Sequence, residues 1–387
     1  RTSRICTSMI EEKNKIRDWL LDQKNSLDDC IRKAASSYYG LNNKTSNFSY
    51  DVNVCNNESY NLSRGKDLFY DRPGTAFSYS LWYQGRRINM LLPYFLDLIY
   101  DSRDRDKLEV FDLGAGTGAV QIALGLIVKG FEINGVKCPQ IRVVNIDTSA
   151  IMLEYSRSYL WKAFDSQFEV KNLIQPSYSV NSWINNSDIR LYNPWIIASY
   201  LFDSSDNVEE LVDDFKNLLE ELQVEKIILL TSAQTKKVDL LNQVANSINE
   251  NYSVQGVVKN PLFTGVMSKT YYTRKWLREN AGLNFGNTPM WNDSSFYGKI
   301  MTKKVSKLSL DFQEEQEVTE VDLYNPPIVM RREVELSESQ MKASEDDGRP
   351  TIITGPAGCG KSIVITERVL TVVLKAIEEN RINEIRI

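Results

Sequence analysis

Histidine is absent from all 387 residues of the chain. Its absence excludes, within these residues, a serine or cysteine nucleophile activated by histidine and a zinc ion held by histidine. Any general base must therefore be a carboxylate, a lysine, a tyrosine or a water molecule held by the backbone. The five cysteines are scattered, with no C-x-x-C pair, so we expect neither a disulfide framework nor a zinc site built from cysteine.

Long apolar runs are also missing. No stretch reaches the length of a membrane-spanning helix and no signal-like segment begins the chain, so we expect a soluble, cytoplasmic protein without a membrane partner. The net charge of −5 argues against a basic surface over the whole chain but is compatible with a local basic groove. The length and a hydrophobic content of 42% suit roughly two to three domains.

Residues 1–69 predict a helical or irregular extension. Apolar side chains recur at helical spacing from about residue 8 to residue 40, whereas residues 41–68 are rich in asparagine and serine and predict a loop. Residues 76–100 carry aromatic residues and an arginine pair before an apolar helical run. These aromatic and basic side chains form either the core of a helical cap or an acceptor cleft: Tyr79, Trp82, Tyr83, Arg86 and Arg87.

Residues 70–304 alternate between predicted strands and helices, which is typical of a doubly wound, mostly parallel α/β sheet. Strands are predicted at residues 109–113, 141–146, 168–173, 195–201 and 226–231. Helices are predicted at residues 118–129, 149–162, 207–222 and 236–249. Two further segments, residues 253–258 and 296–301, are candidate closing strands of the sheet, and an antiparallel pair is one arrangement open to them.

A glycine-rich turn follows the first predicted strand, where residues 110–118 read VFDLGAGTG. Glycines permit a tight strand-to-helix turn and the close approach of a ligand to the backbone. Gly114, Gly116 and Ala119 also satisfy the dinucleotide pattern G-x-G-x-x-[GA], which is weak by itself. The turn therefore indicates a nucleotide-like ligand without identifying it.

Two carboxylates favour a ligand other than a dinucleotide. Asp112 stands two residues before the first glycine, where it would repel a pyrophosphate but could hold a cationic amino group through a water molecule. The second predicted strand ends at Asp147, whose carboxylate can accept hydrogen bonds from both hydroxyls of a ribose.

With these residues the segment resembles the class I S-adenosylmethionine-dependent methyltransferases. Their first motif, D-x-G-x-G-x-G, and their second, an acidic residue followed by a helix start like D-x-S-x-x-M-L, both stand here in order. The resemblance covers roughly residues 70–300. It implies a Rossmann-like sheet and S-adenosylmethionine as cofactor. The residues that would lie along its methionine part are Asp112, Gly114, Gly116 and Gly118; Asp147 would bind its ribose, and Asn172 would lie near its adenine.

The methyl acceptor has candidate residues around the fourth predicted strand. The letters NPW, beginning at Asn193, resemble the (D/N)-P-P-(Y/F/W) motif of methyltransferases that act on exocyclic amino groups. If the strand spans residues 189–192, the motif stands at its carboxyl end. If it spans residues 195–201, the motif lies at the amino end, and Tyr200 and Asp203 become the catalytic candidates. The apolar run WIIASYLF favours the second register.

The amino-acid composition of the chain changes after residue 304. Residues 305–335 are acidic, contain a proline pair and predict a linker. Residues 355–362 then read GPAGCGKS, a complete G-x-x-x-x-G-K-[ST] loop between an apolar strand and a helix-compatible stretch. Such a loop points backbone N–H groups at phosphate oxygens, with lysine on the β/γ-phosphates and serine on Mg²⁺. The motif predicts binding of a nucleoside triphosphate.

Residues 336–387 resemble the start of UvrD/Rep-like superfamily 1 helicases, because an upstream glutamine, the P-loop and Arg368 stand in order. The resemblance implies a partial RecA-like domain, ATP with Mg²⁺, and nucleic acid as partner. No Walker B-type motif or second lobe follows, so we expect these residues alone not to hydrolyse ATP and the chain to belong to a longer protein. The residues matched to ATP are Gln340, Gly355, Gly358, Gly360, Lys361 and Ser362, the last of them also on Mg²⁺.

The leading hypothesis is the N-terminal part of a nucleic-acid-acting fusion between a methyltransferase-like domain and a superfamily 1 helicase or ATPase. The alternative is a non-catalytic methyltransferase-like domain that serves as a recognition or regulatory module for the attached helicase or ATPase. The imperfect NPW match favours this alternative, whereas the intact glycine motif opposes it. A third hypothesis is a nucleotide-binding interaction protein that does not touch nucleic acid.

Overall fold

The structure is a computed structural model that describes residues 2–45, 47–62, 69–181, 184, 194–202, 208–221, 224–248, 250–291 and 296–304. The chain divides into two units between Val305 and Ser306, and every described residue lies in the first. The predicted linker and the predicted P-loop module lie outside the described residues. The same holds for the residues matched to ATP: Gln340, Gly355, Gly358, Gly360, Lys361 and Ser362.

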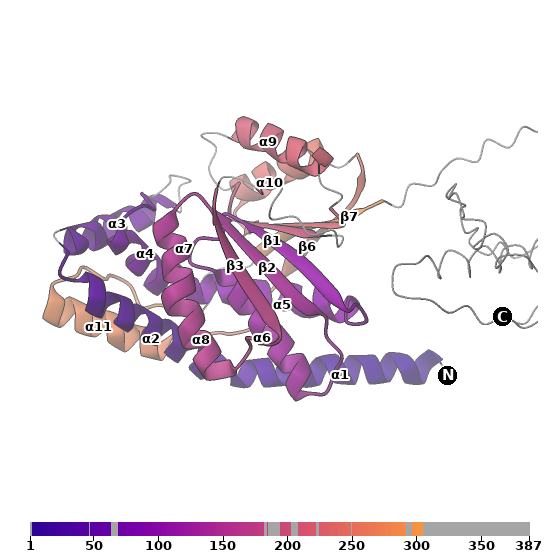
Figure 1. Ribbon diagram of the computed structural model, residues 1–387, viewed down its shortest axis with the longest axis horizontal. Helices are drawn as coiled ribbons and strands as arrows, with labels where there is room; N and C mark the ends of the chain where they lie inside the picture. The colour runs from indigo at the N-terminus through magenta and orange to yellow at the C-terminus, as the bar shows by residue number, and fades with distance from the viewer. Residues whose placement is uncertain are drawn as a thin grey trace, which may run out of the picture. The chain divides into compact units, whose positions relative to one another are not determined.

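A seven-stranded sheet in the order β3-β2-β1-β4-β5-β7-β6 forms the centre of the first unit (Figure 1). The strands β1 to β5 are parallel to one another, and β7 runs antiparallel between β5 and β6. The strands are β1 Lys107–Leu113, β2 Gln140–Asp147, β3 Ile174–Val180, β4 Trp195–Ser199, β5 Lys226–Ser232, β6 Tyr252–Lys259 and β7 Phe296–Lys303.

The central strands are buried on both faces, which explains their nearly continuous apolar sequences. In β1 every residue after Lys107 is buried, and alternate residues enter different cores. Val110 belongs to the larger core, beneath α5 and α6, whereas Phe111 and Leu113 belong to the core beneath α9 and α10. Figure 1 shows these two helix layers on opposite sides of the sheet. The predicted doubly wound α/β architecture is therefore confirmed.

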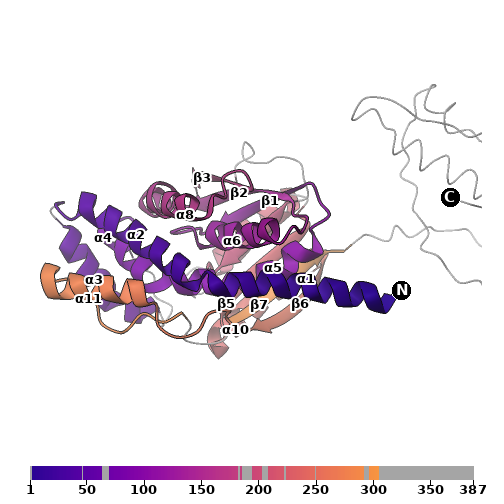
Figure 2. The same cartoon turned by 90° about the horizontal axis from the view of Figure 1, so that it is seen from below.

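Eleven α-helices occur among the described residues, together with two short π-helical turns, η1 and η2. The helix α1 runs along the outside of α5 and α6, as the view from below shows (Figure 2). The helices are α1 Thr2–Asp22, α2 Lys24–Asn42, α3 Phe48–Leu62, α4 Pro73–Tyr79, η1 Ser80–Gln84, α5 Gly85–Asp101, α6 Ala119–Ile133, α7 Ala150–Tyr155, η2 Ser156–Leu160, α8 Trp161–Phe168, α9 Val208–Glu221, α10 Thr235–Ser247 and α11 Ser268–Ala281.

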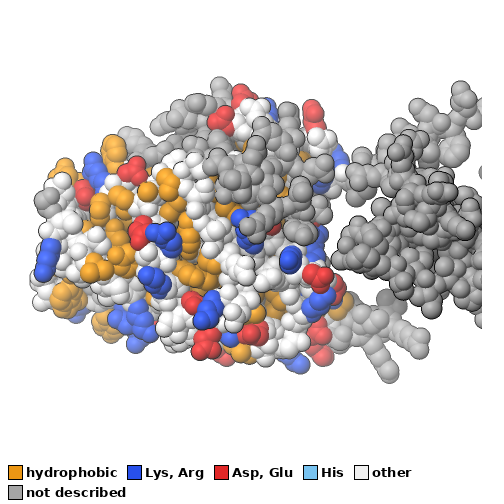
Figure 3. Space-filling view, in the orientation of Figure 1, with side chains coloured by type: hydrophobic (Ala, Val, Ile, Leu, Met, Phe, Trp, Pro, Cys, Tyr) orange, Lys and Arg blue, Asp and Glu red, His pale blue; other side chains and the backbone are white. Residues whose placement is uncertain are grey.

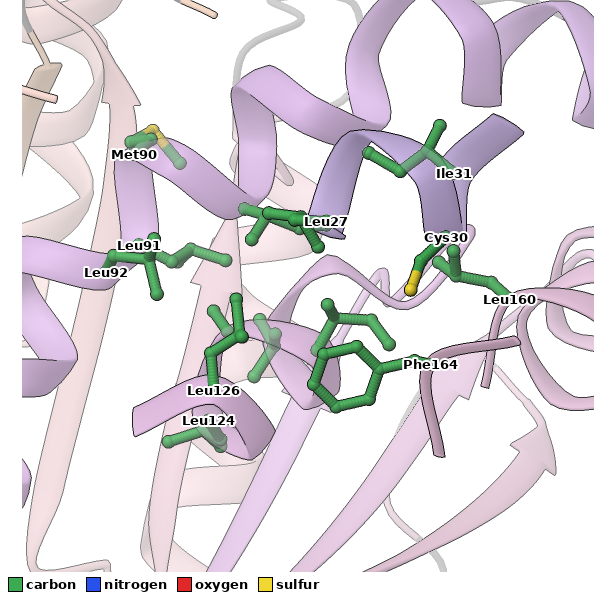
Figure 4. Packing of buried hydrophobic residues seen from close by; sticks show 14 of the residues in the cluster. Leu27, Cys30, Ile31, Met90, Leu91, Leu92, Leu124, Leu126, Leu160 and Phe164 are labelled. Atoms are coloured by element: carbon green, nitrogen blue, oxygen red, sulfur yellow. The ribbon is translucent and has the colours of Figure 1, made fainter. Parts of the chain in front are cut away.

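The larger core joins the N-terminal helices to the sheet. Side chains of α2, α5, α6 and α8 converge there (Figure 4). A Cβ atom at Gly125 of α6 would lie 2.6 Å from the ring of Phe164, so glycine at this position lets the ring pack against the helix backbone. The N-terminal helices are therefore a part of the same folded unit as the sheet.

Two of the expected elements differ from the structure. Residues 161–168 form α8, and β3 begins only at Ile174, so the third strand predicted at residues 168–173 is wrong. The sequence of β3, IQPSYSV, lacks the apolar pattern of a buried strand, because proline and polar residues are tolerated on an edge strand. The loop predicted for residues 41–68 is wrong over α3, whose buried Phe48 and Val52 outweigh a polar composition.

The remaining strand predictions are confirmed, including the antiparallel pair at the end of the sheet. Within the described residues, no helix combines the length and apolarity that crossing a membrane requires. The described side chains also form no group of three or more cysteine or acidic residues arranged to hold a metal ion.

Candidate functional site

The glycine-rich turn lies at the carboxyl end of β1, where the strand order of the sheet reverses between β1 and β4. Ligands of open α/β sheets bind outside the carboxyl ends of strands at such a switch point. Gly114, Gly116 and Gly118 all have positive φ angles, of 69°, 53° and 83°. Glycine adopts this left-handed conformation without the penalty that other residues incur. The spacing of the three glycines is therefore required by the turn.

The surroundings of the three glycines differ. A Cβ atom at Gly118 would collide with the hydroxyl oxygen of Ser156. At Gly114 it would lie 3.2 Å from Leu201, which follows β4, and at Gly116 the closest atom would be 3.7 Å away, on Met152. Glycine at position 118 therefore lets the start of α6 pack closely against η2, whereas a side chain at position 116 would meet less crowding.

Asp112 lies in β1 immediately before this turn and is 2% exposed. Its Oδ2 atom is buried and has no hydrogen-bond partner. Burial raises the pKa of the Asp112 carboxyl well above its ordinary value of 3.8, and the negative charge of Asp147 adds to the shift. A buried carboxylate without a partner is costly, so the geometry fits a cationic group at this position.

Asp147 ends β2 and lies next to the glycine turn. Its Oδ2 accepts a hydrogen bond from the N–H of Gly116 at 2.7 Å, and its Oδ1 accepts one from the N–H of Ser149 at 2.8 Å. Burial raises the pKa of the Asp147 carboxyl, although these backbone donors lower it in part. A carboxylate offers about four acceptor positions. The two bonds therefore fix its orientation and leave further acceptor capacity for a ligand hydroxyl.

Polar side chains support the turn from behind. The Thr117 hydroxyl donates to Oε1 of Gln84, the last residue of η1. The Gln121 amide donates to Ser156 at 2.8 Å and accepts from Asn145 at 2.9 Å. All five side chains are buried. The first bond joins the glycine turn to η1, and the other two join α6 to η2 and β2. π-Helical turns are frequent beside functional sites.

A cavity of about 430 Å³ lies between the start of α3 and residues 71–73 and is lined in part by Asp51, Asp71 and Arg72. The negative charge of Asp71 contributes to the raised pKa of Asp147. The hydroxyl of Ser149 donates to the backbone oxygen of Tyr70 at 3.0 Å, which ties this segment to the start of α7. The segment that lines this cavity therefore lies next to the Asp147 end of the site.

Tyr200 lies on the β4 side of the switch point. Its φ angle of 64° is uncommon for a residue other than glycine, and its N–H donates to Leu230 of β5 at 2.8 Å. The guanidinium of Arg87 lies over its ring and 5.6 Å from the ring centroid of Tyr83. The Nε of Arg87 is buried without a hydrogen bond. Backbone strain of this kind clusters at ligand-binding sites, which keeps Tyr200 as a candidate.

The remaining acceptor candidates, Asn193 and Asp203, flank β4 in the sequence. The structure selects the second register, because β4 begins at Trp195, which is fully buried at the amino end of the strand. Pro194 immediately precedes it, so the described part of the NPW motif, Pro194 and Trp195, lies at the edge opposite the glycine turn. Asn193 and Asp203 themselves lie outside the described residues.

Asn172 also lies at the wrong edge. It is exposed and precedes β3, which starts at Ile174, so it stands at the amino ends of the parallel strands. The prediction that Asn172 lies near an adenine followed from the misplaced third strand and is corrected here.

Sequence patterns missed several supporting residues. Gln84 and Gln121 carry no motif, and only the fold brings them together behind the turn. Ser149 had a recognisable signal, because a serine directly before an apolar helix is a typical N-cap. Its hydroxyl does accept a hydrogen bond from the N–H of Met152.

Comparisons with known proteins give distant structural similarities. No protein-family model and no curated protein matches the chain. A methyltransferase from Pyrococcus furiosus is 13% identical, with 55% of this chain and 83% of that chain covered and a TM-score of 0.33. The N-terminal domain of human METTL16 in complex with SAH is 10% identical, with 67% and 95% covered and a TM-score of 0.33. Likeness at this level carries no functional argument, so function has to be argued from the site itself.

Proposed function

We propose that the domain binds S-adenosylmethionine across the carboxyl ends of β1 and β2 and transfers its methyl group to an acceptor. The observation that carries the proposal is the buried Oδ2 of Asp112, which has no hydrogen-bond partner and stands at the head of the glycine turn. This carboxylate needs a cation, and the amino group of the cofactor provides one. The spacing D-x-G-x-G-x-G supports the same ligand.

The two carboxylates would have separate roles. Asp112 would hold the ammonium group of the methionine part, directly or through a water molecule, while the glycines allow that part to lie close to the backbone. Asp147, oriented by the N–H groups of Gly116 and Ser149, would accept hydrogen bonds from the ribose hydroxyls. Both charges favour a cationic ligand over a pyrophosphate, which supports this ligand against a dinucleotide.

When bound, the cofactor supplies a methyl group on a positively charged sulfur. Asp112, the glycine turn and Asp147 would hold this group for direct displacement by the lone pair of the acceptor, with the electron pair of the broken carbon–sulfur bond left on sulfur. An amine acceptor then loses its proton to water, so the chemistry suits a chain without histidine. The protein would act mainly by holding acceptor and methyl group in line. Tyr200, which follows β4, and Arg87 of α5, whose guanidinium lies over the Tyr200 ring, would position the acceptor.

Transfer of a labelled methyl group tests this proposal. Incubation of the full chain with methyl-tritiated cofactor and a panel of single-stranded and duplex DNA and RNA should give label in the acceptor fraction. We expect Asp112→Ala to abolish incorporation, whereas Asp106→Ala, which removes a carboxylate that is 96% exposed just before β1, should leave it unchanged. Equal incorporation by wild type and Asp112→Ala would contradict the assignment of the site. Binding of cofactor without incorporation into any acceptor would favour the non-catalytic alternative.

We further propose that residues 336–387 bind ATP with Mg²⁺ as the beginning of a helicase-like module. The P-loop sequence and the upstream Gln340 support this part of the proposal, since Lys361 would contact phosphate and Ser362 the metal ion. A nucleic-acid-acting fusion with a superfamily 1 helicase is the whole-protein function that this module implies.

A further inference from the structure

The helix α11 concentrates positive charge in a chain that is acidic as a whole. Its 14 residues contain four cationic side chains and one acidic one, against a net charge of −5 for the chain. The cations are Lys269, Arg274, Lys275 and Arg278, and the acid is Glu279. A local basic surface of this kind attracts an anionic partner.

Two aromatic rings lie on the solvent side of α11. Tyr272 is 66% exposed and Trp276 is 53% exposed. They are four residues apart, so they are neighbours on one helix face. The ring of Trp276 meets the ring of Tyr39 edge-on at 6.4 Å between centroids, which holds the indole in a fixed orientation. Large exposed aromatic side chains grouped together indicate a binding surface.

A cavity of about 310 Å³ separates these rings from α2. Its lining combines cationic, hydroxyl and aromatic side chains: Arg32, Ser36, Lys269, Tyr272, Thr273 and Trp276. Figure 3 shows basic and hydrophobic side chains side by side over the region where α2 and α11 lie in Figure 1. We call Lys269, Tyr272, Lys275 and Trp276 the α11 face.

The α11 face rests on a rigid support. Asp28 of α2 accepts hydrogen bonds from the N–H of Lys269 at 2.7 Å, and from the N–H and hydroxyl of Thr270 at 3.1 and 2.6 Å. These bonds cap the first turn of α11 and fix it beside α2, where Figure 2 also places it. Binding would therefore require little reordering of the helix, which favours affinity.

Arg274 adds a further positive charge on the buried side of α11. Arg274 is buried, its guanidinium lies 3.9 Å from the ring centroid of Trp82, and none of its three nitrogens makes a hydrogen bond. Burial, with Arg86 and Arg278 nearby, lowers the pKa of Arg274 to about 9, so it remains charged at neutral pH. On the α2 side, Asp29 already pairs with Arg32 and Lys33.

We propose that the α11 face binds a single strand of nucleic acid, with bases stacked on Tyr272 and Trp276 and phosphates paired with Lys269 and Lys275. Exposed rings between cations match single strands better than duplexes, whose bases are already stacked on one another. An acidic peptide would use the cations but would leave the two rings without a matching planar group. The proposal does not depend on methyl transfer, and it concerns residues far in sequence from the P-loop.

Fluorescence anisotropy of labelled oligo(dT) and oligo(rU), measured with the full chain without cofactor, tests the proposal. Trp276→Ala and Tyr272→Ala should each weaken binding by about tenfold or more. Lys275→Gln should reduce the slope of log affinity against log salt by about 0.7, as expected for one lost phosphate contact with a single strand. The matched controls are Tyr50→Ala, which removes a ring that is 65% exposed on α3, and Lys171→Gln, which removes an exposed cation. Both controls should bind like the wild type.

Three results would overturn the proposal. The first is unchanged affinity in Tyr272→Ala and Trp276→Ala, since Tyr272 is two-thirds exposed and its removal should not impair folding. The second is equal affinity for duplex and single-stranded oligonucleotides. The third is displacement of the oligonucleotide by poly-L-glutamate as readily as by unlabelled oligo(dT), which would show that the surface attracts any polyanion.

Discussion

Asp112→Asn should unfold at a higher temperature than the wild type at pH 7, although it removes the residue on which the site depends. The Oδ2 atom of Asp112 is buried and has no partner, so the ionised carboxylate opposes folding. Asparagine is nearly isosteric and neutral. We expect an increase of about 1–2 kcal/mol in the free energy of unfolding, which corresponds to about 2–8 °C in Tm for a domain of this size.

The pH dependence of this difference has a definite sign. Burial raises the pKa of Asp112 in the folded state above its ordinary value of 3.8. As the pH rises above this value, the unfolded chain releases the proton that the folded chain retains, so the stability of the wild type falls. The advantage of Asp112→Asn should therefore be small at pH 3.5, grow up to the folded-state pKa and remain above it. Thermal unfolding monitored by circular dichroism across this range measures it.

A surface carboxylate provides the control for Asp112. The side chain of Asp106 is 96% exposed, and Asp106→Asn should change the free energy of unfolding by less than about 0.5 kcal/mol. Destabilisation by Asp112→Asn at pH 7 would show that the carboxylate already has a favourable partner within the protein. The reason for assigning a cationic ligand to this position would then disappear.

Gly118→Ala should be the most destabilising single substitution in the glycine turn. Its φ angle of 83° costs an alanine about 1–2 kcal/mol, and the new Cβ would collide with the Ser156 hydroxyl, which adds about 1–3 kcal/mol. We expect a total loss of about 2–5 kcal/mol in the free energy of unfolding, measured by urea denaturation.

Gly135→Ala separates the two causes. Gly135 has a φ angle of 65° but no atom within 4 Å of the position of a Cβ, so it should show the backbone penalty alone. Gly116→Ala, with its closest atom 3.7 Å away, should resemble Gly135→Ala in stability and yet weaken cofactor binding. Equal losses for Gly118→Ala and Gly135→Ala would mean that η2 shifts freely and that the turn is not rigidly supported.

The sequence predicts the parts of this fold in which local pattern and tertiary environment agree. Buried strands such as β1 and β5 are continuous apolar runs, and the glycine turn requires glycine at positions that the motif also marks. The edge strand β3 and the polar helix α3 were missed because packing decided their structure against their composition. Because the third strand was predicted too early in the sequence, Asn172 was expected near its carboxyl end. Asn172 instead precedes the amino end of β3.

The candidate site likewise combines residues that the sequence predicts with contacts that only the fold creates. Asp112 and Asp147 were predictable, because each stands at the carboxyl end of a predicted strand and such ends meet at one edge of a parallel sheet. The missing partner of Asp112 was not predictable, since it depends on every atom that packs around the carboxylate. The contact of Arg87 with Tyr200 was equally hidden, because it joins residues 113 positions apart through the fold.

The most direct test of the proposed cofactor site is a calorimetric titration of S-adenosylmethionine into the wild type, Asp112→Ala and Asp147→Ala at pH 7.5. We predict one binding site in the wild type and an affinity lower by about 10- to 150-fold in each variant, the range expected for the loss of a hydrogen bond to a charged group. Binding should also weaken on acidification, because protonation of Asp112 removes the charge that faces the cofactor's amino group. No binding to the wild type, or binding that both substitutions leave unchanged, would contradict the proposal.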